Sequence, residues 1–172
     1  MYLLINGNPG KLMKILRLFI CGIWLISYGS VAFSSDDAPW GSATSADDSY
    51  RPQKVLYDLS SGDEHALISI LDRVSYLNTL YENDPFDMSV VIVVHGSAIQ
   101  FFTKEQYGMY RDIMHRAQSL TVGNPIEFRM CQAAARVQGL SPADVHGFVK
   151  MVPMADAEII RLQREEDYAY LR

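Results

Sequence analysis

The chain has 172 residues, of which 49% are hydrophobic, and its 20 Asp and Glu outnumber its 15 Lys and Arg to give a formal net charge of −5. This length fits one domain with a core of its own and leaves no room for a second. Nucleic-acid binding relies on clustered Lys and Arg that contact phosphates, so the acidic composition predicts no nucleic-acid partner.

The N-terminus has the three-part pattern of a secretory signal peptide. Basic residues at 11, 14 and 17 precede an apolar run over 18–26, and the small residues Ser30 and Ala32 follow. We predict a signal peptide over 1–32 with cleavage after Ala32, and a cut after Ser34 is an alternative. The apolar run is shorter than the roughly 20 residues of a membrane-spanning helix, which makes a retained anchor the less favoured interpretation.

Removal of residues 1–32 changes both the charge and the thiol content of the chain. The 140 residues that stay have lost three cations, which leaves 12 Lys and Arg against 20 Asp and Glu and a net charge of −8. Cys131 becomes the only cysteine, so no intramolecular disulfide can form in a compartment that permits them. We predict a periplasmic protein with no membrane attachment after cleavage, whose thiol is buried, paired between chains or functional.

Residues 33–53 are predicted to form a disordered linker. They are rich in Ser, Asp and Pro and contain almost no apolar residues. Too little surface can be buried there to offset the entropy cost of ordering the chain. The folded domain is therefore expected over residues 54–172.

The domain is predicted to begin with a strand over 54–59, which the loop 60–62 ends. Asp63 is placed to cap a helix over 64–81, where apolar residues recur at intervals of three and four. The run over 88–94 is β-branched and almost without polar residues, which is typical of a strand buried on both faces. We expect that strand to be central and parallel.

The second half of the domain continues the alternation of strands and helices. It is predicted to contain a turn at 95–97, a helix over about 104–120, a strand over 126–130, a helix over 131–138, a strand over 148–152 and a helix over 155–164. Residues 168–171 alternate and are expected to add an edge strand, within the chain or to a neighbour. Such interleaving implies right-handed crossovers, so the fold class is α/β, a three-layer α/β/α sandwich on a mainly parallel sheet of about five strands.

Two candidate site positions lie at the predicted carboxyl ends of strands. Sites in open α/β sheets gather at that edge. His95, which Gly96 follows, ends the second strand, and Cys131 ends the third. We therefore expect His95 and Cys131 to lie together although they are 36 positions apart.

Cys131 is the strongest candidate for chemistry. A thiol at a helix N-terminus meets unpaired backbone N–H groups and the positive end of the helix dipole, which favour the thiolate. Arg129 is a candidate for added positive charge, and His95 either orients the thiolate or only closes its own turn. A thiolate can accept sulfane sulfur as a persulfide by thiol exchange. The alternative is a small buried side chain, since free Cys is among the most buried residue types.

No metal site is predicted. His65 is expected on the solvated side of its helix, and His115 and His146 lack the spacing of metal ligands. The loop 60–62 lacks the glycine pattern of a phosphate loop, and we interpret it as a turn with a helix cap. The aromatic and Met residues over 107–114 have helical spacing, which favours a core face over an oligomer face.

Several segments together carry a resemblance to a known family. They are Val91–Ala98, Phe128–Ala133 with Gly139-Leu140 after it, and Phe148–Pro153 leading to Leu162-Gln163 and Tyr168–Leu171. In order and spacing they resemble the DsrE/DsrF-like family over roughly residues 54–171. The resemblance implies a flavodoxin-like sandwich, a homo-oligomer such as a trimer or hexamer, and, in the sulfur-trafficking branch, a cysteine that carries a persulfide.

Cys131 matches the cysteine position of that family, and His95-Gly96 matches its turn after the second strand. The chain departs from the family at Asp167, where a glycine is common, which leaves the local turn open to difference. It also departs in its predicted export, because the best-known members are cytoplasmic.

Two functions follow from the sequence. The favoured one is an exported sulfur carrier, a possible sulfurtransferase, in which Cys131 holds sulfane sulfur with help from Arg129 and His95, and which meets a sulfur donor or acceptor. The alternative is a non-catalytic oligomeric protein that binds a small ligand or a partner segment between His95 and Cys131, with a structural cysteine. Neither function implies a cofactor.

Overall fold

The computed structural model describes residues 40–46, 49–123 and 126–172. The predicted signal peptide over 1–32 lies outside the described residues, and so does part of the predicted linker. The described linker residues, 40–46 and 49–52, are exposed and contain no helix or strand. Within the described ranges, no helix has the length and apolar character needed to cross a membrane.

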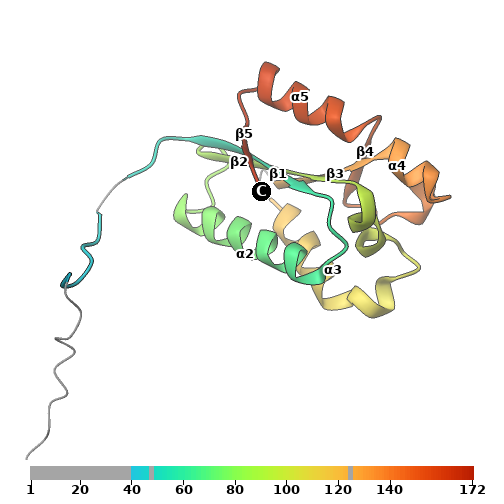
Figure 1. The fold of residues 1–172 in the computed structure, drawn as a ribbon, viewed down its shortest axis with the longest axis horizontal. Helices are drawn as coiled ribbons and strands as arrows, with labels where there is room; N and C mark the ends of the chain where they lie inside the picture. Colours follow the sequence, from blue (N-terminus) through green and yellow to red (C-terminus); the bar gives the residue numbers. More distant parts are fainter. Residues whose placement is uncertain (1–39, 47–48, 124–125) are drawn as a thin grey trace, which may run out of the picture. The chain divides into compact units, whose positions relative to one another are not determined.

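A five-stranded sheet forms the centre of the domain (Figure 1). Its strands are β1 (Gln53–Leu59), β2 (Met88–Val94), β3 (Ile126–Cys131), β4 (Val149–Val152) and β5 (Ala169–Leu171). Their order is β4-β3-β2-β1-β5, and every pair is parallel. The prediction of a central, parallel strand over 88–94 is confirmed, and the predicted edge strand pairs with β1 of the same chain.

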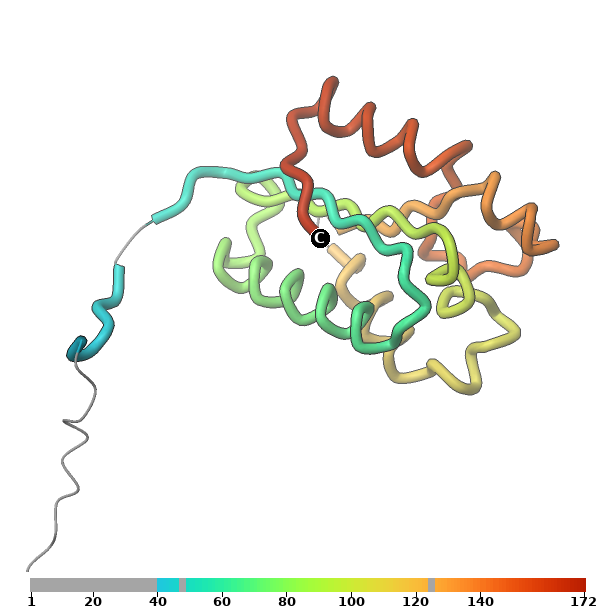
Figure 2. The backbone as a smooth tube through the Cα atoms, in the orientation of Figure 1, coloured from blue at the N-terminus to red at the C-terminus, as the bar shows by residue number. Residues whose placement is uncertain are grey.

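Helices cover both faces of this sheet. They are α2 (Glu64–Leu80), α3 (Tyr107–Thr121), α4 (Gln132–Val137) and α5 (Ala155–Glu165), with short 3-10 helices at Gly96–Phe102 and Pro142–Asp144. In the trace of Figure 2, α2 and α3 lie on one side of the sheet and α5 on the other. The three-layer α/β/α prediction is therefore confirmed.

The helix α2 begins as the sequence predicts. The Asp63 side chain accepts a hydrogen bond from the backbone N–H of His65 at 3.0 Å, which satisfies one of the free donors at the helix start. The chain turns out of the helix at Glu82 and Asn83, both of which have left-handed backbone, with φ of 55° and 59°. His65 itself is exposed, as predicted.

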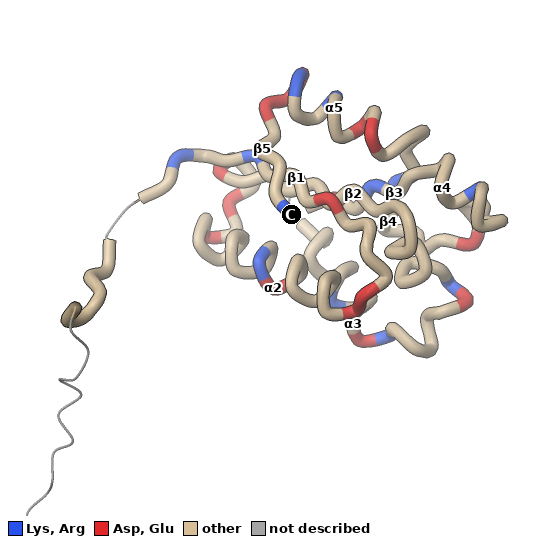
Figure 3. Tube along the Cα trace, viewed as in Figure 1, with Lys and Arg blue, Asp and Glu red and all other residues tan. Residues whose placement is uncertain are grey.

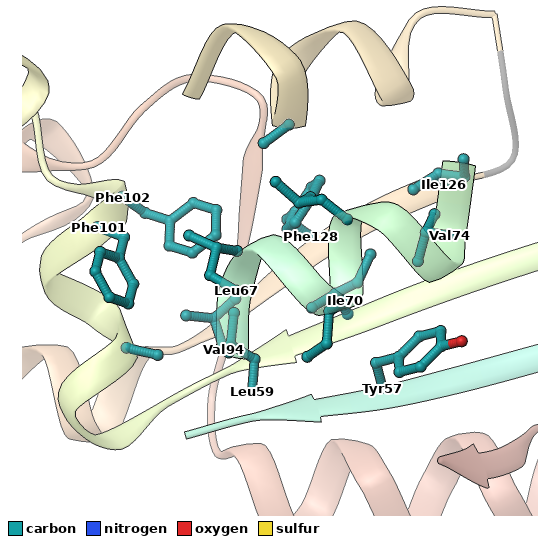
Figure 4. Packing of buried hydrophobic residues seen from close by; sticks show 14 of the residues in the cluster. Tyr57, Leu59, Leu67, Ile70, Val74, Val94, Phe101, Phe102, Ile126 and Phe128 are labelled. Carbon is teal, nitrogen blue, oxygen red and sulfur yellow. The ribbon is translucent and has the colours of Figure 1, made fainter. Parts of the chain in front are cut away.

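The larger apolar core lies between the sheet and the pair α2 and α3 (Figure 4). Leu67 and Ile70 of α2 meet Tyr57, Phe102 and Phe128 there. Because alternate residues of a strand face opposite sides, the other residues of β1, β2 and β3 form a smaller cluster beneath α5. The sheet is thus buried on both faces at β2, as its apolar sequence predicts.

The helix α3 begins three residues later than the expected start near 104. The Lys104 backbone N–H donates to Asp144 O at 2.8 Å, and Thr103 forms a bridge with Val145. These long-range contacts hold residues 103–104 outside the helix, so α3 starts only at Tyr107. The local residue pattern cannot reveal contacts between segments so far apart in the sequence.

The aromatic and Met stripe of α3 is mostly core, as predicted. Met114 is buried, and Tyr107 and Tyr110 pack against the larger cluster. Met109 is the exception, because 74% of it is exposed.

Asp167 has the left-handed backbone that glycine favours, with φ of 60°. Because a side chain at such a φ is strained, we expect Asp167→Gly to raise the free energy of unfolding by up to about 1 kcal/mol. Urea denaturation of the two proteins measures the difference. The matched variant Asp167→Ala keeps the strain, and a gain of the same size in that variant would contradict this explanation.

Candidate functional site at the carboxyl edge of the sheet

Cys131 is the last residue of β3 and the N-cap of α4. Its Sγ accepts a hydrogen bond from the backbone N–H of Ala134 at 3.4 Å. The predicted position between strand and helix is therefore confirmed, with the helix proper starting one residue later. The side chain lies in the smaller apolar cluster beside Val93 and Ala155, and only 5% of the residue is exposed.

His95 follows β2 with an extended backbone, and its N–H donates to Leu59 O at 3.0 Å. Its Nε2 lies 2.7 Å from Oδ1 of Asp58, at the end of β1. Tyr170 of β5 donates its hydroxyl to the other oxygen of Asp58, also at 2.7 Å. The imidazole is thus held by a carboxylate that a second side chain orients.

His95 and Cys131 lie at the carboxyl ends of two adjacent strands. Val94 pairs with Met130 across β2 and β3, so the next residues of the two strands are neighbours. The His95 ring is turned towards Asp58 of β1, and among the described residues no hydrogen bond joins it to the Cys131 thiol. The structure therefore brings these two sequence-predicted site residues to the same edge of the sheet, with different partners for their side chains.

Gly96 makes the turn after His95 possible. Its φ is +57°, and a Cβ on it would lie 2.9 Å from Ser60 O. That carbonyl accepts hydrogen bonds from the backbone N–H and the hydroxyl of Ser97, both at 3.1 Å. Gln138 at the end of α4 donates to Gly96 O at 2.8 Å, which links the turn to the helix that follows Cys131.

The variant Gly96→Ala is expected to lose about 2–3 kcal/mol of unfolding free energy, because it combines a left-handed φ with a clash against Ser60 O. Gly139→Ala is the matched control, since its φ is +76° and nothing lies within 4 Å of the added Cβ. Urea denaturation of both variants separates the clash from the backbone strain. Equal losses in the two variants would contradict the proposed contact.

Arg129 is buried, with 6% of the residue exposed, and two carboxylates contact it. Its guanidinium lies 2.5 Å from Glu158 and 3.0 Å from Glu127. Burial opposes the charge, but these hydrogen bonds hold the pKa of Arg129 above its ordinary value. Its charge is thus balanced by the two carboxylates, on the sheet face that also carries Cys131.

Glu158 is the centre of this charged cluster. Its other partner is Arg161, which also binds Glu166. The hydrogen bond from Arg161 does most to lower the pKa of Glu158 from 4.5 to about 2, burial opposes that change, and Arg129 adds to it. Figure 3 shows acidic and basic residues interspersed along α5.

His115 and His146 lie away from this edge. They line a cavity of about 490 Å³ with Tyr107 and Phe148. Burial lowers the pKa of His146, and the charge of Lys104 adds to this effect. In the described part of the chain, no three His, Cys, Asp or Glu side chains are grouped as metal ligands.

Sequence reasoning missed three residues of this region, namely Asp58, Glu158 and Tyr170. Asp58 is a polar residue near the end of a strand, which is the kind of signal that singled out His95. Tyr170 is 112 residues from Asp58 and Glu158 is 29 from Arg129, so no local pattern joins them.

Residues 69–172 match the model of the DsrE/DsrF-like family. The chain belongs to this family. Its members are linked to sulfur transfer. Among solved structures, the protein of unknown function MTH1491 from Methanobacterium thermoautotrophicum is similar, with a TM-score of 0.58 and 21% sequence identity over 70% of this chain and 98% of its own. That likeness concerns the fold. A search of curated proteins found no match.

Proposed function

We propose that this DsrE/DsrF-like protein is an exported sulfur carrier that holds sulfane sulfur as a persulfide on Cys131. The observation that carries the proposal is the placement of the thiol, which ends β3, accepts the Ala134 N–H and lies at the same edge of the sheet as His95. Family membership supports the same chemistry.

The reaction needs only a donor of sulfane sulfur, such as a polysulfide or a protein persulfide. The Cys131 thiolate attacks the terminal sulfur of the donor R–S–SH, and a new S–S bond forms. The donor's S–S bond breaks, and its inner sulfur leaves as the thiolate RS⁻ with the electron pair. An acceptor thiolate then attacks the outer sulfur of the persulfide and regenerates the Cys131 thiolate, so no external oxidant is required.

In this function the carrier works in the periplasm as a homo-oligomer, a trimer or hexamer, and exchanges sulfur with a donor or acceptor. The predicted signal peptide over 1–32 supports the location, and the family resemblance supports the assembly. Arg129 adds positive charge near the thiol in this proposal. The Glu127 and Glu158 carboxylates limit that contribution.

The test is the intact mass of the purified protein after incubation with polysulfide, before and after reductant. A gain of about 32 Da per sulfur atom that reductant removes is the expected result. No gain, together with a thiol that alkylates only after unfolding, would disprove the carrier function.

The second candidate function is a binding protein with a structural cysteine. The 5% exposure of Cys131 and its place in an apolar cluster favour this alternative, since inert buried cysteines have such surroundings. For such a binding protein, we expect no mass gain with polysulfide and a thiol that alkylates only after unfolding.

A further inference from the structure

An aromatic cavity lies between α3 and the segment 146–148, which leads into β4. Its volume is about 490 Å³, and the side chains that line it are Tyr107, Met114, His115, Gln118, His146 and Phe148. This volume falls within the range of about 300–1,000 Å³ that small-molecule sites occupy. Cys131 is not among the lining residues, so the cavity is separate from the thiol.

Two walls of the cavity are flat and meet at a steep angle. The rings of His146 and Phe148 are nearly parallel, with an interplanar angle of 9° and centroids 5.9 Å apart. The Tyr107 ring is inclined by 70° to the His146 ring, at a centroid distance of 5.5 Å. Aromatic rings prefer offset-stacked and edge-to-face contacts. These walls therefore offer both kinds of contact to a bound ring.

The polar groups around the cavity indicate a neutral ligand. In the described part of the chain, no Asp, Glu, Lys or Arg lines this cavity. Burial lowers the pKa of His146, so its imidazole is neutral at neutral pH. The Tyr107 hydroxyl and Nε2 of His115 are already paired with each other, at 2.9 Å. A charged ligand would leave water here without a group of opposite charge to pair with.

Nε2 of His146 is a buried polar atom without a partner. Among the described residues, nothing forms a hydrogen bond with it. Proteins pair nearly all of their buried polar atoms, because an unpaired one lowers stability. A nitrogen of a neutral imidazole either donates or accepts one hydrogen bond, so a hydroxyl group, which does both, suits either tautomer.

We propose that this cavity binds a small neutral molecule that carries an aromatic ring and a hydroxyl group. The ring packs against Tyr107 and His146, and the hydroxyl is the missing partner of Nε2 of His146. Phenol is the simplest molecule of this class. The site goes beyond the sulfur-carrier function, and neither proposal depends on the other, since the experiments below do not involve Cys131.

The first test follows the methionine methyl signals by NMR while phenol is added to the purified protein. Met114 is a buried wall of the cavity, whereas Met109 is 74% exposed and lines a different cavity. The ring current of bound phenol should shift the Met114 signal saturably, with half of the change at or below about 10 mM, and leave the Met109 signal in place. No saturable shift of Met114, as when a second copy of the chain covers the cavity, would overturn the proposal.

Cyclohexanol is the matched ligand for this titration, because it has the hydroxyl group but no aromatic ring. It is expected to bind several-fold more weakly than phenol, since it makes no ring-to-ring contact with the walls. Equal affinity for the two compounds would overturn the assignment to aromatic ligands.

The second test fills the cavity. A Cβ added at Gly147 or at Gly108 would meet no atom within 4 Å, but only Gly147 lines this cavity. Gly147→Leu is expected to weaken phenol binding by at least about ten-fold, because the new side chain takes up space that the ligand needs. Gly108→Leu is the control and should leave the affinity unchanged. Unchanged affinity in Gly147→Leu would overturn the proposal.

The third test is His146→Phe, which keeps a ring beside Phe148 and removes Nε2. Phenol should bind this variant more weakly, while the midpoint of urea denaturation of the free protein should rise, because the buried unpaired atom is gone. A histidine with only a structural role would show the second effect without the first. Unchanged phenol affinity in His146→Phe would therefore overturn the proposed hydrogen bond.

Discussion

Replacing Glu158 by Gln is expected to lower the free energy of unfolding by about 3 kcal/mol at neutral pH, because it removes the charge that balances a buried guanidinium. Arg129 is 6% exposed, and its contact with Glu158 is 2.5 Å long. Glu127 cannot replace that contact fully, since its side chain is 50% exposed and its charge is screened by water. Urea denaturation followed by circular dichroism gives the value.

The control for this variant lies on the same helix. Glu165→Gln changes an exposed carboxylate of α5 and is expected to alter stability by less than about 0.5 kcal/mol. A similar loss of unfolding free energy in both variants would show that the effect comes from changing α5 and not from breaking the buried ion pair. The double variant Glu158→Leu with Arg129→Met should recover most of the loss, because an apolar pair leaves no unpaired charge.

Glu158 also makes the free energy of unfolding depend on pH. Its pKa is lowered from 4.5 to about 2, so its stabilising contribution is complete above pH 4.5 and is lost as the pH falls towards 2. A shift of this size corresponds to about 3 kcal/mol. The gap in unfolding free energy between wild type and Glu158→Gln should therefore narrow over this range. A gap that is constant from pH 5 to pH 2 would contradict the assignment.

The second large effect is expected in Cys131→Ser, which should take up no reducible sulfur from polysulfide. The hydroxyl is not a nucleophile for sulfane sulfur at neutral pH, so the loss is complete. The fold should stay intact, because Ser is a preferred N-cap and can accept the Ala134 N–H that Sγ now accepts. Intact mass and circular dichroism on the same sample report both properties.

Cys131→Ala separates the two roles of this side chain. It also removes the sulfur chemistry, but it leaves the Ala134 N–H without its cap and is expected to lower stability by about 1 kcal/mol relative to Cys131→Ser. Sulfur uptake by either variant would place the reactive group elsewhere in the chain. Equal stability of the two variants would mean that the N-cap hydrogen bond contributes little.

Burial of Cys131 makes its reactivity depend on the size of the reagent. With 5% exposure, a small polysulfide anion reaches the sulfur more easily than a bulky maleimide. In an unfolded chain this difference should disappear. The comparison distinguishes a thiol that lies behind a narrow opening from one that is closed to all reagents.

Residue patterns along the chain predicted the helices and strands closely wherever interactions between neighbouring residues determine them. The β-branched run over 88–94 is β2 with the same bounds, and Asp63 caps α2 as expected. The start of α3 was predicted three residues too early, because the hydrogen bond from Lys104 to Asp144 overrides local helix preference. Periodicity and capping act over a few residues, so they reveal nothing about such a contact.

Local residue patterns were enough to predict the α/β class, the succession of strands and helices along the chain, and the positions of His95 and Cys131 at strand ends, because these depend on neighbouring residues. The groups that surround these two residues follow from long-range packing and could not be predicted in this way. Placing β5 beside β1 brings Tyr170 to Asp58, across 112 residues, and packing α5 on the sheet brings Glu158 to Arg129. Such pairs arise from the order of strands and the docking of a helix, which the burial of apolar surface decides for the whole chain at once.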